Sequence, residues 1–153
     1  MEYILNPCNG EIVKSEKIND ESFSKEMLGP CFGVNPSSNN IYAPINGKIM
    51  IAEKHAVAIK SEDNGIEIII HCGINTVEIS EEISKKIFNQ KHSVGDIIKQ
   101  GELLLVIDID KIKKLHFDPI VVVIVTRESI KGKNVKLIAE GNKLAKDKIM
   151  SIS

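Results

Sequence analysis

Two histidines, His55 and His71, stand at the ends of two neighbouring apolar runs. His55 begins the run H-A-V-A-I, and His71 ends the run I-E-I-I-I-H, after which Gly73 breaks the pattern. A run of β-branched residues holds a side chain on a stiff support, and a glycine after it lets the backbone turn away and leave the imidazole accessible. The polar cluster S-E-D-N-G at 61–65 predicts a hairpin turn between the runs. The pattern therefore predicts two antiparallel strands that carry both histidines at one end.

The register of this hairpin decides whether the two imidazoles meet. If the turn is centred on Asp63, opposed residues have numbers that sum to 126, as 55 and 71 do. The two Cβ atoms would then lie roughly 5 Å apart on one face of the sheet. A loop of even length would instead put the rings on opposite faces. The sequence predicts a histidine pair on the condition that the first register holds.

Two opposed imidazoles have three ordinary uses. A zinc site needs a third ligand, and two histidines alone are incomplete for it. A proton relay is the second use. The third is phosphoryl transfer, in which one neutral ring attacks phosphorus and the other hydrogen-bonds the phosphoryl oxygens. The apolar surroundings and the lack of a carboxylate base at a fixed spacing favour the third use, although a histidine that ends an apolar run is more often structural.

The other residues with reactive side chains have simpler interpretations. Cys72 alternates away from His71 along its strand, which predicts a small buried side chain. His92 and His116 fall in turn or helix contexts and are predicted to be solvated. Because these other residues are predicted to be buried or solvated, His55 and His71 remain as the candidate site.

Length and composition exclude several classes of protein. The 153 residues fit a single domain over 1–153 with a core of its own. Lysine and arginine (20) balance aspartate and glutamate (21), and 4% of residues are aromatic, which argues against nucleic acid as a partner. The three cysteines have no paired spacing, which argues against disulfides and favours a reduced, cytoplasmic setting. No apolar run approaches the roughly 18 residues of a membrane span.

An internal repeat indicates how the strands are organised. The segments N-P-C-N-G-E-I-V at 6–13 and A-P-I-N-G-K-I-M at 43–50 share Pro, one residue, Asn-Gly, a charge and an apolar pair. Asn-Gly adopts positive φ easily, so each copy predicts a tight turn that leads into a strand of one of two similar β units. Strands are also predicted at 32–34, 103–108, 119–126, 135–139 and 148–152, with short helical turns at 80–89 and from Asp108 or Asp110 to Leu115. The predicted fold is all-β, an antiparallel sandwich or barrel.

Several strings together resemble the glucose-family IIA component of the bacterial phosphoenolpyruvate-dependent sugar phosphotransferase system. They are H-C-G-I-N-T-V-E at 71–78, K-H-A-V-A-I-K at 54–60, A-P-I-N-G-K-I at 43–49, V-G-D at 94–96 and the early P-C-N-G-E-I, and they span nearly the whole chain. The resemblance implies a β-sandwich phosphotransferase component. It implies that the histidine-containing phosphocarrier protein phosphorylates His71 on Nε2, and that the group then passes to a cysteine on the IIB domain of a sugar permease. His55 would support the phosphoryl group.

The resemblance also implies a docking surface around the histidines. Its apolar members would be Phe23, Leu28, Ile51, Ala58, Ile69 and Val77, in a shallow depression, and Asp20, Glu21, Asn75 and Glu78 would lie on a rim that meets the basic phosphocarrier. No cofactor is required. Zinc between His55 and His71, completed by a partner's carboxylate, is allowed by the resemblance.

Two departures from the family pattern leave an alternative open. Glu53 replaces a usual threonine, and an anion pointing inward there would repel a phosphoryl group. Asn75 replaces a usual aspartate. The alternative is a divergent regulatory module of the same fold that controls permeases or kinases with little net transfer. A zinc peptidase is disfavoured because no His-x-His exists, and a biotin or lipoate carrier because no lysine stands at a suitable hairpin tip.

Overall fold

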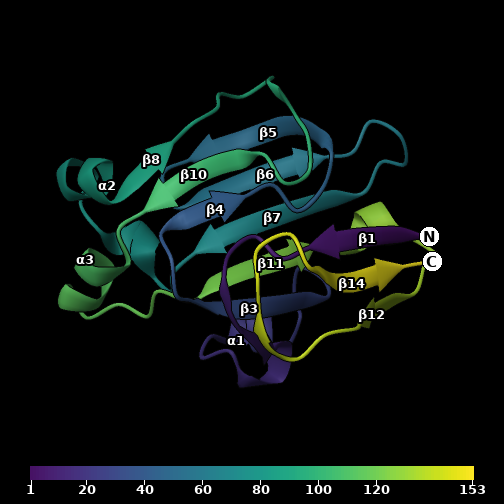
Figure 1. Cartoon of the computed structure of the whole chain (residues 1–153), viewed down its shortest axis with the longest axis horizontal. Helices are drawn as coiled ribbons and strands as arrows, with labels where there is room; N and C mark the ends of the chain where they lie inside the picture. The colour runs from purple at the N-terminus through teal and green to yellow at the C-terminus, as the bar shows by residue number, and fades with distance from the viewer.

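The computed structural model of this protein describes all residues from Met1 to Ser153. It consists of short strands, three short α-helices and three 3-10 helices (Figure 1). The strands are β1 (Glu2–Leu5), β2 (Gly10–Lys14), β3 (Cys31–Pro36), β4 (Asn40–Tyr42), β5 (Gly47–Glu53), β6 (Ala56–Lys60), β7 (Glu67–Cys72), β8 (Phe88–Gln90), β9 (Ile97–Ile98), β10 (Leu103–Ile107), β11 (Val121–Val125), β12 (Val135–Leu137), β13 (Gly141–Lys143) and β14 (Lys148–Ile152). The helices are α1 (Glu21–Ser24), α2 (Glu81–Ile87), α3 (Ile109–Lys114) and the 3-10 helices η1 (Ser15–Lys17), η2 (Thr76–Glu78) and η3 (Arg127–Ile130).

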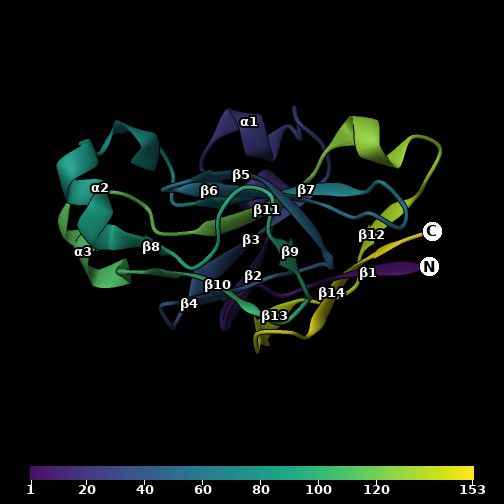
Figure 2. The same ribbon diagram turned by 90° about the horizontal axis from the view of Figure 1, so that it is seen from above.

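The strands form one large sheet and two small ones. The large sheet has eight strands in the order β13-β2-β3-β11-β7-β6-β5-β9, and the small sheets have the orders β1-β14-β12 and β4-β10-β8. All pairings are antiparallel. Figure 2 shows β4, β10 and β14 below strands β5, β6, β7 and β11 of the large sheet, and α1 above these strands. The predicted all-β antiparallel sandwich is confirmed. None of the helices has the length and apolar character needed to cross a membrane.

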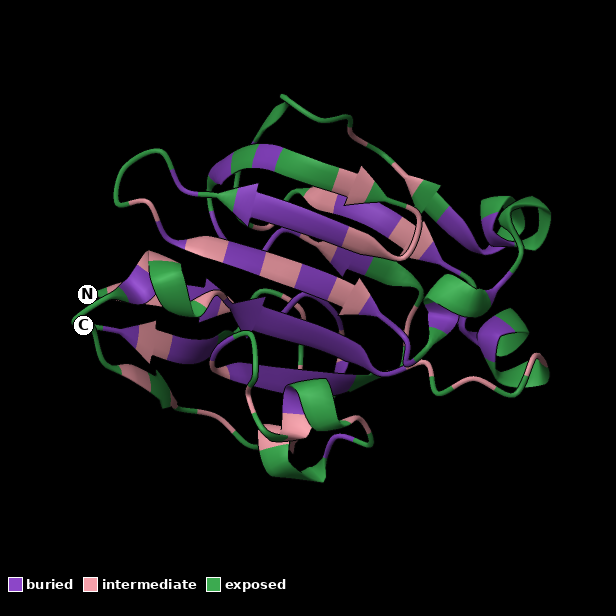
Figure 3. Ribbon diagram, turned by 180° about the vertical axis from the view of Figure 1, so that it is seen from behind, coloured by how far each residue is buried: buried purple, intermediate pink, exposed green.

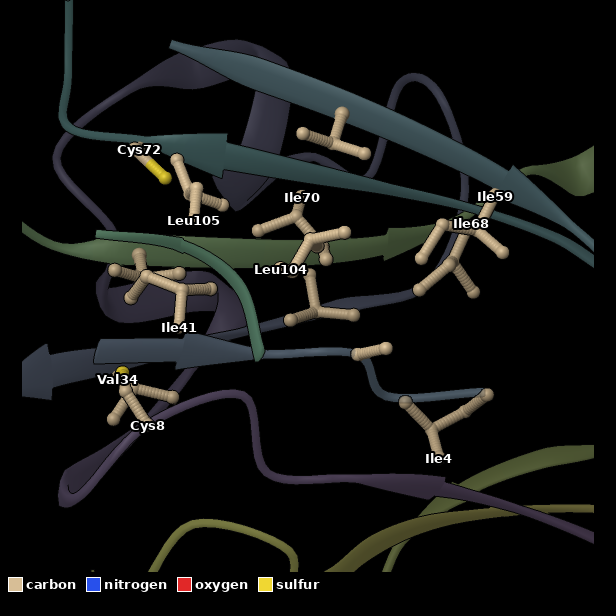
Figure 4. Close-up of a cluster of buried hydrophobic side chains, with 14 of the residues drawn as sticks. Ile4, Cys8, Val34, Ile41, Ile59, Ile68, Ile70, Cys72, Leu104 and Leu105 are labelled. Carbon is tan, nitrogen blue, oxygen red and sulfur yellow. The ribbon is translucent and has the colours of Figure 1, made fainter. Parts of the chain in front are cut away.

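The main core lies between the large sheet and the small ones, and β7 sends every second side chain into it. Ile68, Ile70 and Cys72 are fully buried, next to Leu104 and Leu105 of β10 (Figure 4). The side chains between them in β7 are half-buried and point to the other face, as the alternating bands along this strand show (Figure 3). The prediction that Cys72 is a small buried side chain is confirmed. β7 therefore directs His71 away from the main core.

A second, smaller core covers part of that other face. It consists of Ile18, Phe23, Cys31, Ile74, Ile120, Val122 and Ile124. Phe23 belongs to α1, and the carboxylate of Asp20 caps this helix by accepting a hydrogen bond from the backbone N–H of Ser22 at 2.8 Å. α1 thus packs on the sheet beside His71 and leaves the imidazole at the border of the covered area.

The internal repeat occupies equivalent places in the two halves of the large sheet. Gly10 begins β2 and Gly47 begins β5, so each Asn-Gly leads into a strand as predicted. β2 is second from one end of the sheet and β5 is second from the other. The large sheet is therefore built from two similar halves that meet at β11 and β7.

β5 contains a bulge that matters for the candidate site. Ile49 pairs with Ile59 but Ile51 pairs with Ala58, so Met50 is an extra residue in β5. Residues two apart in a regular strand face the same side, but here Ile49 is 1% exposed and Ile51 is 46% exposed. The bulge turns Ile51 outward, onto the face that carries His71.

Candidate functional site

The two predicted histidines lie against each other at one end of β7. The centroids of the His55 and His71 rings are 5.1 Å apart, and the ring planes make an angle of 76°. His71 is the fifth residue of β7, and His55 immediately precedes β6. The predicted histidine pair is present.

The register on which this prediction rested is wrong. His71 pairs with Ala56 and Ile70 with Val57, so opposed residue numbers sum to 127 rather than 126. His55 lies in the two-residue turn with Lys54 between β5 and β6, and is not part of a strand. Alternation of faces holds within a strand but not in a turn, so the His55 ring reaches His71 despite the shifted register.

The carbonyl group of Gly73 fixes the tautomer of His71. Nδ1 of His71 lies 2.8 Å from the carbonyl oxygen of Gly73. A carbonyl oxygen can only accept a hydrogen bond, so Nδ1 carries the proton and donates it. The neutral ring therefore has its unshared electron pair on Nε2. This tautomer is the one required for nucleophilic attack by Nε2.

The backbone around Gly73 is held by several contacts. Gly73 has a φ of +83°, and its N–H donates to the carbonyl of Ile120 at 2.8 Å. A Cβ atom on Gly73 would clash with Cγ2 of Thr76. The Thr76 hydroxyl donates to the carbonyl of Cys72 at 2.6 Å. The turn that holds Nδ1 of His71 therefore depends on glycine at this position.

We expect Gly73→Ala to destabilise the protein and to disturb the His71 tautomer. Positive φ costs a non-glycine residue about 1–3 kcal/mol, and the clash with Thr76 adds to this cost. Gly65→Ala is the matched control, because Gly65 has a φ of +73° with no atom within 4 Å of the added Cβ. Urea unfolding and imidazole ¹⁵N NMR measure the two effects. Equal losses of stability in both variants, with an unchanged His71 tautomer in Gly73→Ala, would contradict the expectation.

Both rings have lowered pKa values. Burial lowers the pKa of His71, the neighbouring His55 lowers it further, and the Gly73 carbonyl and Asp20 act in the opposite direction. Burial also lowers the pKa of His55, against the effect of Glu53, which raises it. Both imidazoles are therefore neutral at pH 7, and Nε2 of His71 is unprotonated there.

An NMR titration of the His55 and His71 rings checks the direction of these two pKa shifts directly. We expect both pKa values to fall below the ordinary value of 6.5 in an NMR titration. Glu53→Gln should lower the pKa of His55 further, because it removes the charge that raises it. Since each pKa is lower in the folded than in the unfolded state, the stabilising contribution is complete above pH 6.5 and is lost as the pH falls through the folded pKa. A pKa above 6.5 for either ring would contradict this assignment.

Four of the six predicted apolar docking residues line a depression that contains His71, and the other two lie on β5 and β6. The Phe23 ring is 5.3 Å from the His71 ring, at 59°. Phe23, Leu28, Ile69 and Val77 line a depression of about 250 Å³ together with His71, Asp20 and Asn75. Ile51, Ala58 and Ile69 oppose one another across β5, β6 and β7 and so form one row beside the depression. Ala58 is 2% exposed and offers little contact area, whereas Val77 is 66% exposed.

Two of the four predicted rim residues, Asp20 and Asn75, line the same depression. Asp20 is half-buried, and Glu21 and Glu78 are exposed. Asn75 has a φ of +60°, a left-handed conformation that asparagine tolerates better than most residues. Glu53 is exposed and lines a neighbouring depression with His55, not the one that contains His71. The charge of Glu53 acts on His55, whose pKa it raises.

Some features around the site have no signal in the sequence. Nζ of Lys54 lies 2.9 Å from Oε1 of Glu81 and so joins the His55 turn to α2. The side chain of Glu81 is 77% exposed, and such ion pairs contribute about 0–1 kcal/mol. This ion pair alone does not fix the turn.

The prediction of two solvated histidines is correct for one of them. His116 is exposed. His92 is 19% exposed, with Nε2 3.0 Å from the carbonyl of Leu103 and its two ring nitrogens near the carboxylates of Asp96 (3.6 Å) and Glu102 (3.4 Å). The prediction is wrong for His92 because contacts from β10 and its preceding turn, distant in sequence, cover the ring.

The residues present do not by themselves complete a metal site. No group of three or more His, Cys, Asp or Glu side chains is arranged to hold a metal ion. His55 and His71 supply two nitrogen ligands, and zinc sites in proteins have at least three protein ligands.

The comparisons with known proteins agree with the geometry. The family profile described as "phosphoenolpyruvate-dependent sugar phosphotransferase system, EIIA 1" matches residues 2–130. The chain is 35% identical over 144 residues to the PTS system glucose-specific EIIA components of two strains of Staphylococcus epidermidis, covering 90% of this chain and 84% of each relative. The solved structure of glucose permease IIA from Mycoplasma capricolum superimposes with a TM-score of 0.84 and 28% identity, covering 97% of this chain and 94% of the other. The chain belongs to the EIIA 1 family of the phosphoenolpyruvate-dependent sugar phosphotransferase system.

Proposed function

We propose that the protein relays a phosphoryl group through His71. As a phosphotransferase-system EIIA component it works with a phosphocarrier and a sugar permease. In the proposed relay, the phosphohistidine form of the phosphocarrier protein donates to Nε2 of His71, and a cysteine of a IIB domain accepts. The observation that carries the proposal is the 2.8 Å hydrogen bond from Nδ1 of His71 to Gly73, which leaves the electron pair on Nε2.

Phosphoryl transfer requires mainly that the reacting groups are correctly positioned and that the charge on the phosphoryl group is stabilised. The electron pair of Nε2 attacks phosphorus, the bond from phosphorus to the donor imidazole breaks, and the donor ring recovers its electron pair. In the second step the cysteine thiolate attacks the same phosphorus, and the electrons of the bond to Nε2 return to His71. The Gly73 carbonyl stabilises the Nδ1 proton while the phosphorylated ring carries positive charge.

His55 is the proposed support for the phosphoryl oxygens. Its ring lies 5.1 Å from the His71 ring, and a phosphoryl group on Nε2 would bring negative charge next to it. That charge raises the pKa of His55 and favours the protonated ring, which donates a charge-assisted hydrogen bond. Glu53 acts on the His55 pKa in the same direction.

The surroundings of the pair suit two successive protein partners. Phe23, Ile69 and Val77 give the depression an apolar floor and wall, which reduces access of water to a labile phosphohistidine. Asp20, Glu21 and Glu78 add negative charge at the rim, which complements a basic donor protein. The proposed docking face includes the row of Ile51 and Ala58.

Incubation with phosphoenolpyruvate, enzyme I and the phosphocarrier tests the relay. We expect one added phosphate by intact mass, removed by acid and retained in alkali, as for a phosphohistidine. Addition of a IIB domain should move the phosphate to its cysteine. A wild-type protein that gains no phosphate contradicts the relay. Uptake without onward transfer to any IIB domain supports the regulatory alternative instead.

A further inference from the structure

The turn that carries His55 has a geometry that needs outside support. Glu53 pairs with Ala56, so Lys54 and His55 form a two-residue hairpin loop. Two-residue loops that match the twist of their strands have positive φ at one or both loop residues. Neither Lys54 nor His55 has positive φ. The turn therefore tends to splay the ends of β5 and β6, and the His55 ring with them.

Gln90 supplies that support from the other layer of the sandwich. Its side-chain Nε2 lies 2.6 Å from the carbonyl oxygen of Glu53 and 3.3 Å from that of Lys54. Both oxygens can only accept, so the amide group donates one N–H to each of the two residues before His55. Gln90 ends β8, which belongs to a small sheet, whereas the turn belongs to the large sheet (Figure 1). Its contact bridges the two sheets at the site.

The position of Gln90 is itself fixed by the core. Gln90 pairs with Leu105 of β10, whose side chain is fully buried. On the other side of the turn, the carbonyl of His55 accepts a hydrogen bond from the N–H of Cys72 at 2.7 Å. Three consecutive carbonyl groups, those of residues 53, 54 and 55, are thus held from two directions. The chain between Cα of His55 and its ring is short, so holding this backbone sets where the ring lies relative to His71.

We propose that Gln90 is a positioning residue of the phosphoryl-transfer site and acts through the backbone of the turn that carries His55. The functional consequence of this inference rests on the proposed relay. A displaced His55 would no longer reach the oxygens of a phosphoryl group on His71. A displacement of about 1 Å from a residue outside the chemistry can reduce a rate up to about 10²-fold. Acceptance of phosphate by His71 depends less on Gln90, because Gly73 and not Gln90 holds the nucleophile.

The test compares Gln90→Leu with Gln100→Leu. Gln100 is an exposed glutamine in a turn, and its backbone N–H, not its side chain, makes the contact with Asn46. In Gln90→Leu we expect the NMR-measured pKa of His55 to rise toward its ordinary value, because a loosened turn exposes the ring. We expect onward transfer to a IIB domain to slow by roughly 10- to 100-fold, with phosphate acceptance retained. Gln100→Leu should match the wild type in all three measurements.

A second variant keeps the proposal testable if Gln90→Leu fails to fold. Gln90→Met has a side chain of similar length with no donor and no charge, and it should change the His55 titration and onward transfer in the same way. A lower melting temperature with an unchanged His55 titration in both variants would overturn the proposal, and so would equal effects of Gln100→Leu. The His55 titration needs no phosphoryl donor. If the wild type accepts no phosphate, the relay fails while the role of Gln90 is still decided.

Discussion

Replacing His71 with glutamine will abolish phosphate acceptance. Glutamine keeps a polar side chain of similar reach but has no nucleophilic nitrogen, and loss of a nucleophile reduces rates by up to about 10⁶-fold, which is below detection in a mass assay. Because Nδ1 of His71 donates to Gly73, an amide at this position can preserve the hydrogen bond to the carbonyl. The variant should therefore fold, and its loss of acceptance should be chemical.

The matched control is His116→Asn. His116 is exposed and has a φ of +67°, a conformation that asparagine also tolerates. It should accept phosphate like the wild type. Undiminished labelling of His71→Gln would show that another residue, with His55 the nearest candidate, is the acceptor.

Replacing His55 with glutamine separates the two halves of the relay. We expect the variant to accept phosphate on His71 but to pass it on roughly 10²- to 10³-fold more slowly, the usual effect of removing one preorganised donor to a developing charge. Glutamine can donate a hydrogen bond but cannot become positively charged, so it lacks the response of an imidazole to a new phosphoryl group. Rapid-quench measurement of transfer to a IIB domain reads this effect directly.

His92→Gln is the control for His55→Gln, because it removes a partly covered histidine in a part of the chain that does not line the His71 depression. Its transfer rate should match the wild type. Full onward transfer by His55→Gln would refute the supporting role of His55. It would also remove the functional reason for holding the turn at residues 53–55.

The parts of the fold that follow from local patterns could be predicted from the sequence. The period-two alternation of β7 placed His71 and Cys72 on opposite faces, and β14 has the bounds predicted for the last strand. Asp108 caps α3 by accepting from the N–H of Lys111, one of the two caps expected. Each of these depends on residues within one turn or strand of each other.

The parts of the fold and the site that depend on contacts between distant segments could not be predicted from the sequence. The predicted hairpin register differs from the observed one by one residue, because the sequence S-E-D-N-G does not define which residue lies at the centre of the loop. A shift of one residue moves every side chain of a strand to the opposite face of the sheet. His92 was expected in solvent because Glu102 and Leu103, which cover it, come from another strand and turn. Gln90 is 36 and 37 residues away from the carbonyl groups it holds. No pattern in the neighbouring sequence identifies Gln90 as a residue that makes these contacts.

The extra residue in β5 decides which side chains this strand presents beside the histidine pair. Met50 shifts the alternation by one, so Ile49 is buried, Ile51 is exposed and Ala52 packs against the main core. A regular strand of the same length would turn Ile51 toward the core and would move the turn with His55 relative to His71. A change in the position of the bulge would therefore alter the docking face without replacing either histidine.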